Sequence, residues 1–518
     1  MKKIIHAAIA APGAGKTQAL INQLKNSVQA GEKVVIALPT LKLNQEIIER
    51  LRTAGLYPRI INSEETEGKA VSKVINGILQ NGKECLIIVT HEGILRSDPS
   101  LLKGYTLVFD EVPSGLELDH FALKIDEARE ILDSTETIGN QLKIKQGLVT
   151  KIKSRVNNYK ASSESRMLKS VLSQAEYKVF STILNDNIVH IEQGKLEEKE
   201  VIHFHIISEK NYFAHISASK ECHILAANIQ GGLFDLFAKN AGVLYKKSKF
   251  TPKPFNYTCD ITIYPMLNKS WSKTQALRTE AGNWWDHRGY YNYQMIDKVL
   301  VTAVNHKPTD KFLVVRNNWA KFNSNYFPKE ITTEIDYCGV DCRGIDSYKN
   351  KTAAFLLFSG KPSPNDQKSL KILSEKYGFP LCELIRAWTM KNKFEASLQA
   401  AARTAIRDRN NQQEVHLYVQ DNEVAEYLKK TYMTNATIDN SLTLEAFQSE
   451  DARCFLNREE QIQARAFIDE CASEGMKRSN INFNLVRNFG FTAATARRWT
   501  QHLAAPKKPT FDLSHFLA

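Results

Sequence analysis

A short glycine-containing stretch near the start of the chain has the composition of a phosphate-binding loop. Residues 10–17 read AAPGAGKT, after the apolar run Ile4–Ile9 and before a helical pattern that starts near Gln18. The glycines let the backbone turn tightly, so that successive N–H groups point at phosphate oxygens, and the helix adds the positive end of its dipole. Strand, loop and helix in this order predict a nucleoside triphosphate site.

The polar side chains of this loop have separate expected roles. Lys16 would reach the β- and γ-phosphates, and the Thr17 hydroxyl would complete the coordination of Mg²⁺. The usual first glycine of such a loop is replaced by Ala10, and Pro12 lies inside it. A glycine turn without a ligand is therefore the competing interpretation. The predicted nucleotide-binding residues are Gly13, Ala14, Gly15, Lys16 and Thr17.

Two acidic residues follow a later apolar strand. The run 105–109 (YTLVF) ends on Asp110 and Glu111. The carboxyl ends of parallel strands gather at one sheet edge, where the phosphate loop also lies. Asp110 could hold Mg²⁺ through water, and Glu111 could polarise the water that attacks the γ-phosphate. Alone, the pair also fits a helix cap and a solvated acid, but with the upstream loop it predicts hydrolysis.

A third candidate segment lies far along the chain. Residues 399–407 read QAAARTAIR. On a helix, Gln399, Arg403 and Arg407 lie four residues apart and project from one face. The small residues between them would let that face pack closely, and arginines at a tight interface suit the charge that develops in phosphoryl transfer. Taken by itself, the segment also fits a solvated basic stripe.

The elements that must position these residues follow an alternating pattern. Short apolar strands alternate with helical stretches, which predicts an α/β fold with parallel sheets covered by helices on both faces. A first set of strands ends with CHILAAN, and a second set starts near Lys311. The strands expected between and around these are 33–39, 84–90, 105–109, 222–228, 311–315, 353–358 and 415–419.

The bulk composition limits the class of protein. The 518 residues carry a net charge of +12, which modestly favours a polyanionic partner. No apolar run approaches the roughly 20 residues that span a bilayer, so we expect a cytoplasmic protein without membrane contact. Eight scattered cysteines without a CxxC pair favour reduced thiols over a zinc site.

Taken in order, these segments resemble those of superfamily 2 helicases, the DEAD/DEAH-like group of tandem RecA-like motors. AAPGAGKT resembles their motif I, VFDE at 108–111 resembles motif II, and QAAARTAIR resembles motif VI. LAAN at 225–228 stands in the place of the Ser-Ala-Thr motif. Further matches are ALPTLKLNQE at 37–46 (motif Ia), VTHEGIL at 89–95 (a strand-contacting motif) and CRGIDSY at 342–348 (motif V).

The resemblance implies ATP with Mg²⁺, bound between two RecA-like domains. It implies that Glu111, Gln399, Arg403 and Arg407 act in catalysis, with Arg407 as the arginine finger, and that Asp346 lies near the ribose. Pro39, Thr40, Thr90 and His91 would contact nucleic acid. The implied domains are 1–244 (RecA-like, with a helical insertion at about 113–220), 245–295 (a basic aromatic linker), 296–430 (RecA-like) and 440–518 (helical).

Several positions depart from the motifs of these helicases. Val112 and Pro113 follow the acidic pair, Asn228 is the only side-chain hydrogen bonder left in LAAN, and Ala402 replaces a glycine. These changes leave ATP binding and hydrolysis as expected, but they put the path from hydrolysis to strand movement in doubt. No adenine-reading glutamine precedes the first motif, so the base preference stays open.

The carboxy-terminal region carries a separate pattern. Residues 481–503 predict a helix, a turn at Gly490 and a second helix capped by Thr492, a spacing that resembles a helix-turn-helix. Between residues 475 and 508 there are seven Lys or Arg and no acid. A small helical bundle with a solvated basic face is the alternative. The side chains expected at phosphates and base edges are Thr495, Arg497, Arg498 and Gln501.

The expected function is an ATP-dependent helicase that acts on nucleic acid, on DNA in preference to RNA, with replication or repair proteins as partners. A duplex translocase that does not separate strands is one alternative, and a non-motor protein switched by ATP is another. A metabolite kinase is less favoured, because it needs neither CRGIDSY nor QAAARTAIR. The six basic residues without an acid at 137–163 could contact a strand or form a solvated face. The aromatic residues of the linker could stack on bases or belong to the core.

Overall fold

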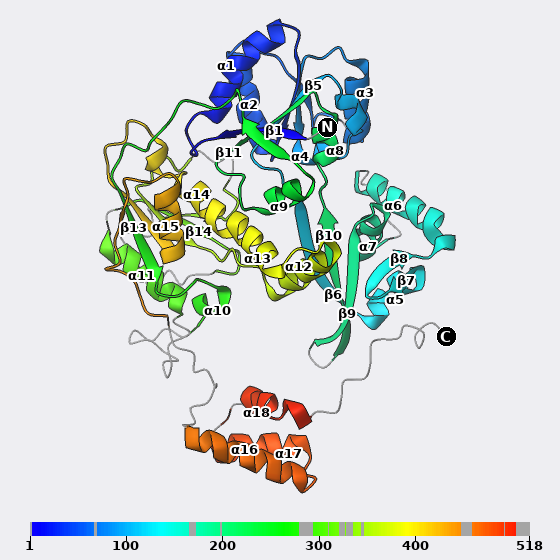
Figure 1. The fold of residues 1–518 in the computed structure, drawn as a ribbon, viewed down its shortest axis with the longest axis vertical. Helices are drawn as coiled ribbons and strands as arrows, with labels where there is room; N and C mark the ends of the chain where they lie inside the picture. Colours follow the sequence, from blue (N-terminus) through cyan, green and yellow to red (C-terminus); the bar gives the residue numbers. More distant parts are fainter. Residues whose placement is uncertain are drawn as a thin grey trace. The chain divides into compact units, whose positions relative to one another are not determined.

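The computed structural model divides into two compact units. One comprises Met1–Ser272 and Leu300–Leu444, and the other comprises Lys273–Val299 and Glu445–Ala518. Three β-sheets are found in the described part of the first unit (Figure 1). The residues that the structure describes are 3–66, 70–164, 172–196, 199–278, 294–308, 310–320, 327, 335–342, 347–446, 458–489, 491 and 493–503.

The first sheet is parallel throughout and has the strand order β12-β1-β11-β5-β2-β4-β3. Alternate residues of one strand enter two different cores, Val34 and Ile36 on one face and Val35 on the other. This is the near-continuous apolar pattern of a sheet covered on both faces. Its strands are β1 (Ile4–Ile9), β2 (Lys33–Leu38), β3 (Arg59–Ile61), β4 (Leu86–Thr90), β5 (Tyr105–Asp110), β11 (Glu221–Ala226) and β12 (Leu244–Lys247).

Helices connect these strands and cover the sheet. The apolar face of α1 buries Leu20, Ile21 and Leu24 against the same core that receives Ile36. The helices are α1 (Lys16–Gln29), α2 (Leu41–Thr53), α3 (Val71–Asn81), α4 (His91–Leu95), α8 (Phe213–Ala218) and α9 (Leu233–Asn240).

The second sheet has the order β15-β14-β16-β17-β13-β18, and its strands also pair in parallel. Together the two sheets confirm the expected α/β fold with two RecA-like parallel sheets. The strands are β13 (Ile261–Leu267), β14 (Phe312–Arg316), β15 (Ile335–Gly339), β16 (Ala353–Leu357), β17 (Val415–Asp421) and β18 (Thr437–Ile438). The helices are α11 (Met295–His306), α12 (Pro364–Tyr377), α13 (Leu381–Thr389), α14 (Ala396–Ala401) and α15 (Asn422–Thr431).

Strand β13 corrects the expected linker at 245–295. Its residues pair with β17, about 150 positions later in the chain, so the second sheet already begins at Ile261. Trp271, also placed in the linker, is 1% exposed, and its backbone N–H donates to Asp421 Oδ2 at 2.9 Å. The strand was not predicted, because the strand that it pairs with is remote in the sequence and the residues that flank it in the sequence are basic and aromatic. The other linker aromatics, Trp284, Trp285, Tyr290, Tyr291 and Tyr293, lie outside the described residues.

The insertion is built on a sheet, which corrects the expectation of a helical insertion. Five antiparallel strands lie in the order β6-β10-β9-β8-β7, and β6 pairs with β10 from Leu116↔Glu209 to Lys124↔Val201. Lysine-rich helices occur within it, but cross-strand pairing decides its core. Its elements are β6 (Leu116–Lys124), β7 (Thr135–Ile138), β8 (Gln141–Ile144), β9 (Ile188–Leu196), β10 (Lys199–Glu209), α5 (Ile125–Ser134), α6 (Val149–Glu164) and α7 (Gln174–Leu184).

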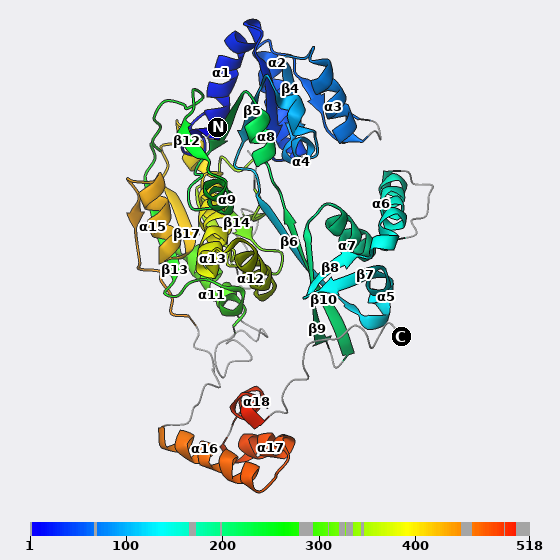
Figure 2. The ribbon, with the colours of Figure 1, turned by 45° about the vertical axis from the view of Figure 1, so that its right-hand side comes forward.

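The insertion also packs against the second RecA-like domain (Figure 2). Helix α12 lies beside β6 and β10, where Asn365 Nδ2 is 3.0 Å from His120 Nδ1 and Lys376 Nζ donates to Glu209 Oε1 at 2.6 Å. An apolar cluster that includes Ile207 of the insertion and Leu370 of α12 closes the same interface. The insertion, which lies within the first domain in sequence, therefore also contacts the second domain.

The second unit is helical in its described part. Helices α16 (Arg458–Ser473), α17 (Arg478–Phe489) and α18 (Ala493–Trp499) share a core that contains Ile468, Leu485 and Ala496, and α10 (Lys273–Ala276) belongs to the same unit. Helices α17 and α18 confirm the two helices expected within 481–503, while the expected turn and cap residues lie outside the described residues. Across the described residues of the whole chain, no helix combines the length and apolarity that crossing a membrane requires.

Candidate active site

The phosphate loop lies between β1 and α1 with the backbone that its glycines were expected to supply. Gly13 and Gly15 have φ angles of +82° and +87°, and Gly15 caps the start of α1. The Lys16 ammonium donates to the carbonyls of Ala10 at 2.7 Å and Ala11 at 3.0 Å. Burial lowers the pKa of Lys16 to about 8, although carboxylates nearby oppose this. The loop thus holds a desolvated cation, which is the counter-charge that a triphosphate requires.

A hydroxyl and a carboxylate meet beside this loop. Thr17 Oγ1 donates to Asp110 Oδ2 at 3.3 Å, and Asp110 ends β5 with only 6% of its surface exposed. Burial, together with the charge of Glu111, raises the pKa of Asp110 to about 7. Hard oxygen donors of this kind suit Mg²⁺. In the described part of the chain, no three His, Cys, Asp or Glu gather as a complete metal site, so such an ion would take its other ligands from phosphate and water.

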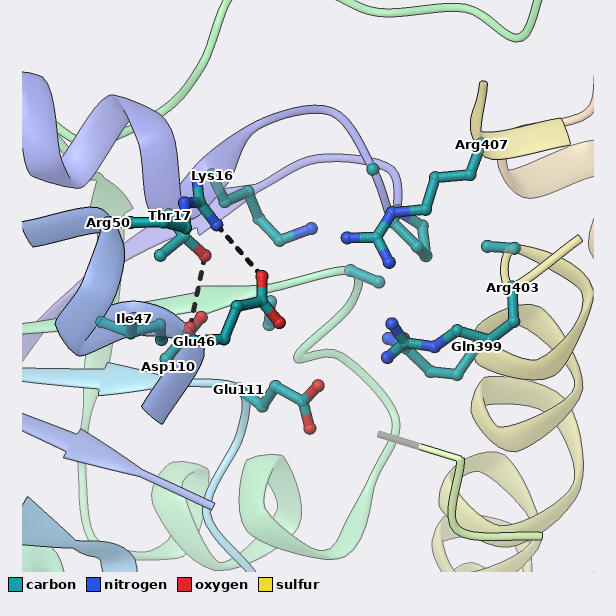
Figure 3. Close-up of a pocket in the computed structure, with 15 residues that line it drawn as sticks. Lys16, Thr17, Glu46, Ile47, Arg50, Asp110, Glu111, Gln399, Arg403 and Arg407 are labelled. Carbon is teal, nitrogen blue, oxygen red and sulfur yellow. Dashed lines mark hydrogen bonds and ion pairs between the residues drawn. The ribbon is translucent and has the colours of Figure 1, made fainter. Parts of the chain in front are cut away.

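Glu111 adopts an unusual backbone conformation. Its φ is +69°, and its N–H donates to the carbonyl of Leu225 at the end of β11 at 2.8 Å. A non-glycine residue in this region is strained, and such strain concentrates at functional sites. Figure 3 shows the Glu111 carboxylate directed toward the side of the cleft that carries Gln399. The conformation therefore presents the carboxylate to the cleft rather than to the sheet.

The three residues of QAAARTAIR reach the cleft, but not from one helix face. Helix α14 ends at Ala401, Arg403 lies in the turn that follows, and Arg407 ends a short 3₁₀ helix over Ala405–Arg407. The prediction of a continuous helix is therefore wrong. Gln399, Arg403 and Arg407 nevertheless line the same cleft as the phosphate loop (Figure 3).

The cleft gathers residues from both RecA-like domains. Lys16, Thr17, Asp110 and Glu111 line it from the first domain, opposite the glutamine and arginines of the second. All four catalytic residues expected from the sequence are thus brought together. Its complete lining is Pro12, Gly13, Lys16, Thr17, Glu46, Ile47, Arg50, Asp110, Glu111, Ala226, Ala227, Gln399, Ala402, Arg403 and Arg407.

Sequence reasoning missed several residues around this cleft. Glu46 and Arg50 of α2 form an ion pair at 3.5 Å, and Arg50 Nη2 donates to Gln18 Oε1 at 3.0 Å. Their i, i+4 spacing was the available signal, but the same spacing is common on solvated helices. Tyr257 is buried, and its hydroxyl donates to the carbonyl of Pro12 at 2.9 Å. That contact joins residues 245 positions apart, so no local pattern could reveal it.

The residues of the first domain that are expected to contact nucleic acid differ in how far they are buried. Pro39 and Thr40 follow β2 and are half-buried. The Thr90 hydroxyl caps α4 by accepting from Gly93 N at 3.0 Å. His91 is only 7% exposed and packs edge-on against Phe109, with ring centroids 5.5 Å apart. The His91 side chain thus lies in the core, and its expected contact with a strand stays a prediction.

The remaining predicted site residues lie elsewhere. Asp346 and most of CRGIDSY fall outside the described residues. Ala14, within the phosphate loop, is buried and belongs to an apolar cluster that also contains Ala11. Arg497 and Arg498 are exposed on α18, and the Arg497 carbonyl accepts from Arg478 Nη2 at 2.8 Å.

Comparison with known proteins identifies the class of the first domain. Residues 2–143 match the model of the DEAD/DEAH box helicase family. Residues 2–143, which contain the phosphate loop and the acidic pair, are thus similar to this family, and the resemblance to superfamily 2 helicases is confirmed for this part of the chain. None of the curated proteins matches the chain.

Solved structures with a similar arrangement include a chain titled XPD helicase, with 13% identity and a TM-score of 0.48, covering 85% of this chain and 96% of that one. Xpd4 of S. tokodaii shares 11% identity at a TM-score of 0.44, with the same two coverages. A DEAD box protein from the hyperthermophile Methanococcus jannaschii shares 11% identity at a TM-score of 0.27, covering 85% of this chain and 89% of that one.

Proposed function

We propose that this protein is an ATP-dependent nucleic-acid helicase. The observation that carries the proposal is the shared cleft, in which a phosphate loop and an acidic pair face two arginines from a second RecA-like domain. A site divided in this way can be completed only when the two domains close over the nucleotide. Such closure converts the presence of a γ-phosphate into a change of domain arrangement.

The side chains of the cleft divide the chemistry of hydrolysis among them. Lys16 would bind the β- and γ-phosphates, and Glu111 would orient the attacking water and accept its proton. Arg403 and Arg407 would stabilise the charge that spreads over the phosphate oxygens in the transition state. Thr17 and Asp110 would hold Mg²⁺, which when bound supplies positive charge to the phosphates.

Movement along a strand would follow from differential binding. With ATP bound, both domains share its phosphates through Lys16 on one side and the arginines on the other. Hydrolysis removes that bridge and lets the cleft open. Alternate gripping of the strand by the two domains would then move the protein, with Pro39, Thr40 and Thr90 as candidate contacts in the first domain.

DNA is the preferred partner in this proposal, mainly because of the carboxy-terminal helices. Arg497 and Arg498 are exposed on α18, and the net charge of the whole chain is +12. Exposed arginines on the second of two short helices suit phosphates and base edges of a duplex. A cytoplasmic role in replication or repair fits this partner.

The first test is the rate of ATP hydrolysis with and without single-stranded DNA, duplex DNA and RNA. We expect nucleic acid to stimulate turnover by the wild type and Lys16→Ala to abolish it. Lys25→Ala removes an exposed lysine of the same helix, α1, and serves as the matched control with unchanged turnover. Hydrolysis that no nucleic acid stimulates would contradict a motor and favour the non-motor, ATP-switched protein.

The second test separates unwinding from movement on duplex. A helicase displaces one strand of a partial duplex in the presence of ATP. A duplex translocase instead displaces the third strand of a triplex and leaves the partial duplex intact. Triplex displacement without strand displacement would replace the helicase by the translocase, while the same cleft would still hydrolyse ATP.

A further inference from the structure

The helix that leads to Gln399 contains a segment of π-helix. Residues Met390–Glu395 (η5) adopt this wider form between α13 and α14. Short π-helical segments are rare in proteins, but those that do occur are often found at functional sites. Its position is constrained by packing, because a Cβ atom at Gly360 would overlap the backbone carbonyl of Asn392.

A buried lysine fixes the same segment. Lys393 is 2% exposed, and its ammonium contacts Asp421 Oδ2 at 2.8 Å and Glu423 Oε2 at 2.6 Å. A buried cation with two carboxylate partners resists displacement, because moving it would leave charge unpaired. The π-helix is therefore held in place, and so is the direction of its last residue, Glu395.

Glu395 lies where the two RecA-like domains meet. Its carboxylate accepts a hydrogen bond from the Tyr427 hydroxyl of its own domain, and it lines one cavity with Asn228 of the first domain. Burial raises the pKa of Glu395, and the neighbouring Tyr427 and Asn228 side chains oppose this. Close by, the Tyr432 hydroxyl donates to the carbonyl of Ala227 at 2.6 Å. The segment that follows β11 in the first domain is thus held by side chains of the second.

The contact between the second domain and the segment after β11 lies beside the part of the cleft that carries Glu111 and Gln399. Glu395, Asn228, Glu111 and Gln399 line one cavity of about 420 Å³. Glu395 is close enough to Lys16 and Glu111 for their charges to influence one another. Since Glu111 N donates to the carbonyl of Leu225 near the end of β11, a shift of the segment after β11 would also displace Glu111.

We propose that Glu395 is a positioning residue for ATP hydrolysis, and that it acts by holding Asn228 across the domain boundary. The carboxylate connects the segment after β11 to the π-helix that precedes Gln399. The two sides of the cleft therefore keep the same relative position when the cleft closes. This inference rests on the proposed ATPase function, which it deepens. It assigns the role to a residue outside every motif recognised in the sequence.

The test compares single and double variants for turnover at saturating nucleic acid. We expect Glu395→Ala and Asn228→Ala each to lower kcat about tenfold, with KM for ATP changed less than about threefold, because a misplaced group costs rate rather than nucleotide binding. The double variant should lose no more than either single one, since both remove the same contact. Glu395→Gln should recover part of the rate, because its amide oxygen can still accept a hydrogen bond from Asn228.

Glu383→Gln is the matched control, since Glu383 is exposed on α13 of the same helical run, and it should keep the wild-type kcat. Wild-type kcat in Glu395→Ala, or a double variant that loses about a hundredfold, would overturn the inference while leaving the ATPase proposal intact. A wild type that hydrolyses no ATP would overturn both. Should Glu395→Ala unfold, Tyr427→Phe removes one donor to the same carboxylate and should still lower kcat without raising KM.

Discussion

The side chain of Arg407 lies against Gly13 of the phosphate loop, so that a Cβ atom at residue 13 would stand 3.1 Å from Arg407 Cγ. The two residues are almost 400 positions apart and belong to different RecA-like domains. Their contact means that the loop and the arginine cannot be varied independently. The second domain therefore contacts the first at the point where phosphate would bind.

Gly13→Ala should therefore damage the cleft in two ways. The φ of +82° strains an alanine, and the new methyl group presses on Arg407. We expect kcat for ATP to fall at least about tenfold. Gly31→Ala is the control, because Gly31 has a similar φ of +76° with nothing within 4 Å. Both variants should lose about 1 kcal/mol of unfolding free energy from strain, and only Gly13→Ala should lose activity. Equal activities would show that the contact with Arg407 is unimportant.

Arg407→Ala should keep nucleotide binding and lose turnover. The guanidinium is expected to act on the charge of the transition state, so kcat should fall by about a hundredfold or more while the Kd of a fluorescent ATP analogue stays within about threefold. Arg409→Ala removes an exposed arginine outside the cleft lining and should leave kcat unchanged. Strong residual turnover in Arg407→Ala would transfer the role to Arg403.

Lys393→Met should destabilise the second RecA-like domain. Removing the ammonium leaves the buried Asp421 carboxylate without its partner, and such a loss costs about 3–5 kcal/mol. A denaturant titration should show an earlier unfolding midpoint than in Lys430→Met, which removes an exposed lysine of α15. Identical midpoints for the two variants would contradict a stabilising role of this ion pair.

Acid should weaken the insertion through His205. Burial lowers the pKa of this imidazole to about 4, with His120, His190, Glu192 and Lys368 as the nearby charged or titratable groups. The unfolded chain therefore binds a proton that the folded chain does not, and stability is lost as the pH falls below about 6.5. We expect a loss of about 1 kcal/mol or more between pH 7 and pH 5.

Thermal unfolding at several pH values measures this effect. His205→Phe removes the titrating group and should flatten the pH dependence between pH 7 and pH 5. An unchanged pH dependence in His205→Phe would assign the acid sensitivity to another group.

Local spacing was enough to predict the chemical core of the first domain. A strand, a glycine loop and a helix occur within residues 4–29, and the acidic pair stands at the end of a strand that is apolar apart from Thr106. Such features depend on neighbouring residues and on the rule that parallel strands end at one edge. That Lys16, Thr17, Asp110 and Glu111 line one cleft could therefore be predicted before any tertiary contact was known.

Other features depend on contacts between remote residues and could not be predicted in this way. The insertion forms a sheet because β6 pairs with β10, some 80 residues later, while its lysine-rich segments suggested helices. The helix before Arg403 ends early, yet the turn still delivers both arginines to the cleft. His91 is buried because Phe109 and Tyr212 surround it in the fold.

The sequence by itself determined that this chain holds a phosphate loop, an acidic pair and a distant arginine-bearing segment. Only the tertiary structure decided that Arg407 packs on Gly13, that Tyr257 supports the loop, and that Glu395 and Asn228 line one cavity. The physical reason is that side-chain periodicity records the burial of a local face, whereas a cleft between domains depends on pairings hundreds of residues apart.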